Sequence, residues 1–198
     1  MKKLFLAAIA VFGFVSVQAQ DVKFGAKGGL NLANITGSDA GGSNMKAGFH
    51  VGAFVEIPIA DKLIIQPEIH YSNQGTQQDG AFEGISFDAK FQLNYINVPV
   101  MFKYAITEKF SIEGGPYVGF LTSAKIEVDV AGFGSNSEDV KELFKSTDFG
   151  LGIGMNYDFS DVIFANVRYQ AGLTQIGDSG EGDDIKNSVI QIGLGFRF

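Results

Sequence analysis

Residues 188–198 read S-V-I-Q-I-G-L-G-F-R-F, and from residue 190 onward every second side chain is apolar. Because successive side chains of a β-strand point to opposite faces, this stretch has one apolar face and one face of polar residues and glycine. Chain ends usually fray into solvent, so an apolar face that continues to a terminal aromatic residue favours the closing strand of a barrel. The residues on this face are Ile190, Ile192, Leu194, Phe196 and Phe198.

The same alternation recurs in seven earlier segments, so the sequence predicts eight strands. They span residues 22–35, 46–58, 62–73, 89–104, 110–122, 147–158, 161–173 and 188–198. Three connections are very short, and four are long and rich in Gly, Ser, Asn and Asp, at residues 36–45, 74–88, 123–146 and 175–187. This layout is typical of an outer-membrane barrel. The predicted fold class is all-β: an eight-stranded antiparallel up-and-down transmembrane β-barrel with meander topology.

Two segments depart from the simple pattern. In residues 89–104 the apolar side chains up to Tyr95 occupy odd positions, whereas those from Ile96 onward occupy even positions. A β-bulge near Tyr95 and Ile96 would restore a single outward face. In the third long connection, Val140, Leu143 and Phe144 have helical spacing, which is compatible with a short helix over residues 137–144.

The apolar faces are expected to point outward into lipid. The opposite faces are rich in glycine, which suits the inside of a narrow barrel, while large apolar side chains suit a lipid-facing band. The chain has no Trp, so interfacial girdles are expected from Tyr71, Tyr95, Tyr157 and Tyr169. The alternative is a soluble periplasmic ligand-binding barrel, which would need a polar outer face.

Charged residues of both signs fall on the inward faces. Because an unpaired charge in a narrow lumen is costly, these residues are predicted to pair. An interior that is filled by side chains disfavours an open aqueous pore, although a small-solute porin remains an alternative. The predicted network sets Glu56, Glu68 and Glu113 opposite Lys103, Arg168 and Arg197, with Lys23, Lys27, His50 and His70 also inward.

Composition limits the function further. A length of 198 residues suits one domain, and the absence of Cys excludes a disulfide framework, a Cys-based zinc site and a lipoprotein anchor. A net charge of −7 argues against nucleic acid as a partner. Residues 1–19 are predicted to be a cleaved signal peptide, because Lys2 and Lys3 precede an apolar run and a cleavage site at Ala19. The barrel domain would then span residues 20–198; an uncleaved helical anchor is disfavoured because the apolar run is short.

No catalytic, cofactor-binding or metal site is predicted. His70 and Ser72 repeat the His-x-Ser pair of lipid A deacylase barrels, but in those enzymes the pair faces lipid, whereas here it is expected to point inward. The fourth long connection is acidic, and its carboxylates are compatible with binding of Ca²⁺ or with bridging to lipopolysaccharide through divalent ions. Its spacing does not match the EF-hand loop, so a solvated acidic loop is preferred. Its acidic residues are Asp178, Glu181, Asp183 and Asp184.

Several segments, in this order, resemble the small outer-membrane β-barrel proteins called PorT-like and often labelled "porin family". They are Q-P-E-I-H-Y-S-N-Q-G at 66–75, Y-I-N-V-P-V-M-F-K-Y at 95–104, residues 114–121, R-Y-Q-A-G-L-T at 168–174, and the closing Q-I-G-L-G-F-R-F. The resemblance implies an outer-membrane location in Gram-negative cells. It also implies insertion by the barrel-assembly machinery, which reads a terminal strand with alternating apolar residues and a final aromatic residue.

The resulting hypothesis is a monomeric, non-enzymatic protein that is integral to the cell outer membrane and needs no cofactor. Its partners are expected to be outer-membrane lipid and lipopolysaccharide, with the barrel-assembly machinery acting during insertion. Its role is expected to be structural or to involve surface contact through the four long loops. The apolar residues of the closing strand, from Ile190 to Phe198, are the expected assembly signal.

Overall fold

The structure is a computed structural model that describes residues 22–38, 40, 44–82, 85–130, 134–178 and 184–198. The predicted signal peptide lies outside these residues. Within the part that is described, no helix has the length and apolar character needed to cross a membrane.

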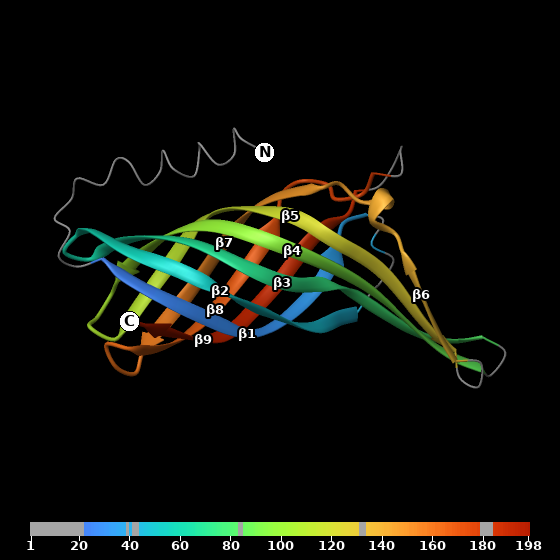
Figure 1. The fold of residues 1–198 in the computed structure, drawn as a ribbon, viewed down its shortest axis with the longest axis horizontal. Helices are drawn as coiled ribbons and strands as arrows, with labels where there is room; N and C mark the ends of the chain where they lie inside the picture. Colours follow the sequence, from blue (N-terminus) through green and yellow to red (C-terminus); the bar gives the residue numbers. More distant parts are fainter. Residues whose placement is uncertain (1–21, 39, 41–43, 83–84, 131–133, 179–183) are drawn as a thin grey trace.

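Eight strands form a closed antiparallel ring, which confirms the predicted fold class (Figure 1). The ring closes between the last strand and the first, from Gly25 opposite Arg197 to Thr36 opposite Lys186. The remaining pairs follow the order of the chain from β1 to β5, and β5 then pairs with β7, β7 with β8 and β8 with β9. In ring order the strands are β1 (Lys23–Thr36), β2 (Asn44–Ala60), β3 (Leu63–Phe82), β4 (Ile85–Ala105), β5 (Phe110–Val130), β7 (Thr147–Asp158), β8 (Ile163–Gly172) and β9 (Lys186–Arg197).

The outer face of the ring is apolar. Leu30, Ile153 and Leu194 are 64%, 67% and 59% exposed, and such large apolar side chains continue around the wall. An exposed apolar band of this extent suits lipid and contradicts the soluble-barrel alternative, which needs a polar exterior. The inner face holds mainly polar side chains and glycine, with aromatic and other apolar side chains at a minority of positions. At Gly195, for example, an added side chain would overlap the ring of Phe164, the residue paired with it on the adjacent strand.

The short turns and the C-terminus lie at one end of the barrel, which we call the turn end; the opposite end is the loop end (Figure 1). At the loop end, β3 and β5 continue far beyond their predicted ends, β4 begins slightly before its predicted start, and β5 pairs there with the short strand β6 (Gly134–Asp139). These segments form what we call the protruding sheet, residues 78–82, 85–92, 123–130 and 134–139.

The second and third long connections were expected to be loops, and this expectation is wrong for most of their length. Hairpin β3–β4 pairs as far as Phe82 opposite Ile85, and β5 extends to Val130. Outside the membrane a strand needs no apolar face, so polar and Gly-rich composition does not exclude it. The expected short helix is reduced to a single 3₁₀ turn, η1 (Lys141–Leu143).

The expected phase slip in β4 is also wrong. The β4–β5 pairing does shift between Asn94 and Tyr95, but the extra residue is Thr122 of β5, and the alternation of β4 itself continues. Leu93 and Tyr95 therefore point into the lumen and are 0% and 1% exposed. Tyr95 cannot belong to a lipid-facing girdle, because apolar side chains fill the loop end of the lumen and Tyr95 packs among them.

Candidate functional site

The turn end of the lumen contains one cluster of paired charges. Lys103 Nζ lies 2.6 Å from Glu56 Oε1, and Arg197 Nε lies 2.8 Å from Glu56 Oε2. Arg197 also pairs with Asp158 at 2.8 Å, and its guanidinium carbon lies 4.4 Å from the centre of the Phe164 ring. Every charge here has an opposite charge within contact distance, which offsets the cost of removing it from water.

The middle of the lumen contains a second cluster, centred on Arg168. Its Nη1 and Nη2 donate to the two carboxylate oxygens of Glu68 at 2.9 and 2.7 Å, while Nε donates to Glu113 Oε1 at 2.5 Å. Lys27 Nζ lies 2.6 Å from Glu68 Oε2. Two carboxylates thus meet two cations in a fully buried, bidentate arrangement, a geometry that specifies orientation as well as charge.

All six residues of the predicted network lie inside the ring and pair as described above. Lys27 joins them, but Lys23 is exposed at the start of β1. The prediction did not include the two asparagines that also bind Glu113: Asn156 donates at 2.9 Å and Asn166 at 3.2 Å. Their even positions in β7 and β8 place them on the inward face, so strand parity alone could have identified them.

Neutral polar side chains fill the part of the lumen that follows the Arg168 cluster toward the loop end. His50 Nδ1 contacts Asn31 Oδ1 at 2.9 Å, and Asn31 Nδ2 donates to Ser72 Oγ at 2.9 Å. His70 is 1% exposed and Ser72 is fully buried. The sheet therefore separates His70 and Ser72 from lipid, unlike the arrangement that a lipid A deacylase pair requires.

Asp148 ties several elements together near the loop end. It accepts hydrogen bonds from Tyr117 Oη at 3.1 Å, Asn187 Nδ2 at 3.0 Å and Thr174 Oγ1 at 3.1 Å. These donors come from β5, β9 and the connection after β8. Hydrogen bonds of this kind join the fourth long connection to the barrel wall.

An apolar plug closes the loop end. Two long connections turn inward and pair with each other, since Lys145 N donates to Ile176 O at 2.8 Å and Asp178 N donates to Leu143 O at 2.9 Å. Their side chains Phe144 and Ile176 pack against inward-facing residues of the barrel. The plug, which the prediction did not include, consists of Ile35, Leu93, Tyr95, Leu121, Ala124, Phe144 and Ile176.

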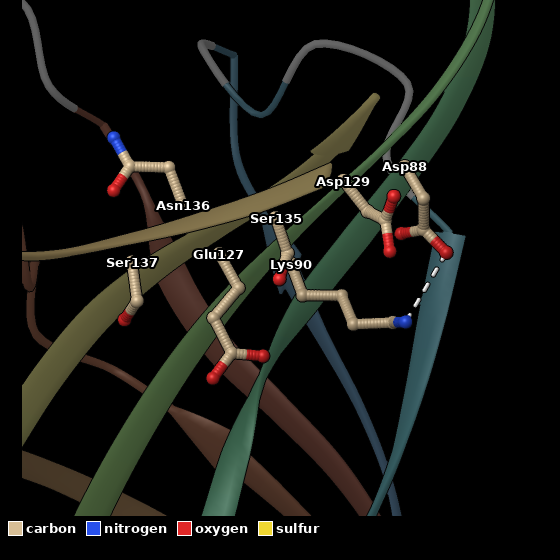
Figure 2. Close-up of a pocket in the computed structure, with 7 residues that line it drawn as sticks. All are labelled: Asp88, Lys90, Glu127, Asp129, Ser135, Asn136 and Ser137. Atoms are coloured by element: carbon tan, nitrogen blue, oxygen red, sulfur yellow. Dashed lines mark ion pairs between the residues drawn. The ribbon is translucent and has the colours of Figure 1, made fainter. Parts of the chain in front are cut away.

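The protruding sheet has a pocket of about 310 Å³ (Figure 2). Inside it Lys90 Nζ lies 3.1 Å from Asp88 Oδ2. The residues that line the pocket are Asp88, Lys90, Glu127, Asp129, Ser135, Asn136 and Ser137.

Over the ranges that the structure describes, no group of three or more His, Cys, Asp or Glu side chains is placed to hold a metal ion. In the acidic fourth connection, Glu181 and Asp183 lie outside the described residues.

The apolar residues of the expected assembly signal lie on the outer face of β9. Ile192, Leu194 and Phe196 are about half exposed, and Phe198 is 78% exposed. The backbone N–H of Phe198 donates to Phe24 O at 2.9 Å, so the terminal residue still takes part in the closing pair of strands.

The sequence matches a family model described as "Outer membrane protein beta-barrel domain" over residues 18–178. A comparison with curated proteins finds no match.

Solved structures of small barrels resemble the whole ring. Ail, the attachment invasion locus protein of Yersinia pestis, is 16% identical with a TM-score of 0.53, and 90% of this chain covers 100% of that chain. A second Ail structure, in complex with the heparin analogue sucrose octasulfate, gives 17% identity and a TM-score of 0.53, with the same coverage. Neisserial surface protein A is 13% identical with a TM-score of 0.56, again covering 90% of this chain and 100% of that chain. At these identities the likeness shows the fold alone.

Proposed function

The chain belongs to the outer membrane protein beta-barrel domain family, and from this premise we propose that it is a non-enzymatic, non-conducting barrel that presents an interaction surface outside the cell. The protein is an integral component of the cell outer membrane, where its apolar wall contacts lipid in a lipopolysaccharide-containing membrane.

The observation that carries the proposal is the filled lumen. Two buried charge clusters and the apolar plug occupy successive levels of a narrow ring, and each is held by contacts between several strands. An eight-stranded ring has room for side chains but little more. These features support a structural interior and speak against the small-solute porin alternative.

The second support is the protruding sheet. It extends from the loop end, which in outer-membrane barrels is the extracellular end, and its charged side chains are accessible. Binding residues are commonly carried on segments that a rigid scaffold positions. A rigid barrel with an exposed sheet fits a surface-interaction role better than transport or catalysis.

Four finer expectations belong to this proposal. The chain is a PorT-like member of the family; residues 1–19 are its signal peptide; the barrel-assembly machinery inserts it by reading the outer face of the last strand; and it acts as a monomer. The outer face from Ile190 to Phe198, which is exposed from Ile192 onward, supports the assembly role.

Labelling of intact cells tests the proposed orientation. The chain has no Cys, so a Ser137→Cys variant places a single thiol on the protruding sheet and a matched Ser160→Cys variant places one in a turn at the other end. A membrane-impermeant maleimide should label position 137 in intact cells and position 160 only after lysis. The opposite pattern would refute a surface role for the protruding sheet.

A further inference from the structure

Strand β6 is an open edge. It is the last strand in the sheet order of the described residues, and all six of its residues are exposed. Val140 N donates to Ala124 O at 3.0 Å, which fixes the direction of the even-numbered N–H groups toward β5. The N–H groups of Ser135, Ser137 and Asp139 therefore point away from β5. Such a row of backbone groups is a template for another strand.

The edge has neither of the two residues that most strongly block edge pairing, because its sequence, G-S-N-S-E-D, has no proline and no lysine. Its only charges are the carboxylates of Glu138 and Asp139, which repel an acidic strand but not a basic one. Ser135 and Ser137 are also short, so they leave room beside the backbone. Among the described residues of β6, these short side chains therefore leave the outward-facing backbone groups accessible to an extended peptide.

Charge indicates what kind of strand fits. Asp79, Asp88 and Asp129 stand directly opposite one another, and Ser135 continues this row onto β6. Like charges in directly opposite positions destabilise a sheet, so a cation beside this row would be favourable. The Oδ1 atom of Asp88 is shielded and has no hydrogen-bond partner, while Oδ2 pairs with Lys90.

The next row places Lys90 opposite Glu127 and Glu127 opposite Ser137 (Figure 2). Neighbouring strands are about 4.8 Å apart, and a strand added beside β6 would lie two such spacings from β5. A lysine or arginine on the added strand would reach over β6, and Glu127 or Asp129 would reach toward it from β5. Since Ser135 and Ser137 are short, they do not block this path. The pocket in Figure 2 lies along it.

We propose that the β6 edge binds an extended basic peptide segment by strand addition, with lysine or arginine at alternate positions directed to Asp129 and Glu127. Main-chain hydrogen bonds would hold the peptide, and the carboxylates would select its charge. A second copy of the chain fits less well, because it would bring two acidic sheets together. The inference rests on the proposed function, since it requires the protruding sheet to face outward.

Peptide binding to the purified full-length barrel in zwitterionic detergent tests the proposal. The probe is a fluorescent peptide of five Lys-Thr repeats, followed by anisotropy. We expect saturable binding that is at least tenfold tighter than that of five Glu-Thr repeats, and tighter than that of a block peptide with five lysines followed by five threonines. Equal binding of the block peptide would reduce the interaction to plain charge attraction and overturn strand addition; absence of binding would also overturn it.

Variants of the edge test the geometry. Ser137→Pro removes an outward N–H and keeps the N–H groups of Asn136 and Glu138 that face β5, so it should weaken binding of the Lys-Thr peptide about tenfold or more. Ser137→Ala is the matched control and should bind as the parent protein does. Ser137→Lys provides a second block of the edge if the proline variant does not fold. Unchanged affinity in a folded Ser137→Pro or Ser137→Lys barrel would refute the proposal.

The carboxylates are tested by Glu127→Gln combined with Asp129→Asn, which should weaken binding at least fivefold and flatten its dependence on salt. A variant that binds like the parent would remove the proposed charge selection. Labelling of Ser137→Cys in intact cells separates the two proposals: a labelled but non-binding protein refutes strand addition alone, whereas an unlabelled one refutes the surface role.

Discussion

Arg168 holds the middle of the lumen together, because it neutralises Glu68 and Glu113 at the same time. Replacing it with alanine leaves Glu68 paired with Lys27, while Glu113 keeps no ion pair among the described residues, and breaking a buried pair in this way typically costs about 3–5 kcal/mol. We expect Arg168→Ala to lower the free energy of unfolding by that amount in urea titrations of the folded barrel.

The matched control is Lys90→Ala, which breaks the Lys90–Asp88 pair on the protruding sheet. Both side chains of that pair are about 40% exposed, so its loss should cost less than about 1 kcal/mol. Equal effects of the two substitutions would mean that the lumen pairs contribute no more than surface pairs do.

For individual residues, the sequence predicted which face of the strand each side chain occupies, but not which residue it contacts across the lumen. A period of two places Glu56, Glu68 and Arg168 on the inward face, because parity is a local property of a strand. The bidentate contact between Arg168 and Glu68 joins β8 to β3 across the lumen, and it depends on the stagger of the strands around the ring. No local pattern encodes that stagger, so neither Asp158 nor Asn166 was predicted as a partner.

Among the elements, the apolar plug determines how firmly the loop end is closed. Phe144 is buried in it, whereas its neighbour Leu143 is 52% exposed. Phe144→Ala should weaken closure by about 3–5 kcal/mol, the usual cost of removing a buried aromatic side chain, and should speed cleavage of residues 134–146 by added protease. Leu143→Ala should leave the cleavage rate close to that of the parent; similar rates for both variants would contradict the plug.

The terminal strand makes a separate prediction. Deletion of Phe198 should lower the amount of folded barrel in the outer membrane more than it lowers synthesis, if the outer face of β9 is the assembly signal. Phe24→Ala is the control, since Phe24 is also a lipid-facing aromatic residue at the turn end and its carbonyl accepts from Phe198 N. Equal folded amounts in the deletion and the parent, measured by heat-dependent gel mobility, would contradict the prediction.

Element lengths were the weakest part of the sequence prediction. Alternation of apolar and polar residues located all eight membrane strands, because lipid demands one apolar face. Beyond the membrane that demand ends, and β6 has only polar residues and glycine, which read as a loop. In β5 the run Ile126, Glu127, Val128, Asp129, Val130 did alternate, and this was the available indication that the strand continues.

The whole molecule is a ring whose wall faces lipid and whose interior is filled with side chains from the turn end to the loop end. One charge cluster lies at the turn end and the other in the middle of the lumen. The neutral polar side chains lie between the middle cluster and the loop end, which the apolar plug closes. Because buried charges and packed apolar side chains are held by opposite walls, the interior should stay closed rather than fluctuate open.

Single-channel recording in planar lipid bilayers tests whether the lumen is closed. The purified barrel, shown to be folded by its heat-dependent gel mobility, should insert without producing discrete current steps in potassium chloride solution. Stable, stepwise conductance that scales with the amount of folded protein would contradict a filled lumen and would restore the porin alternative.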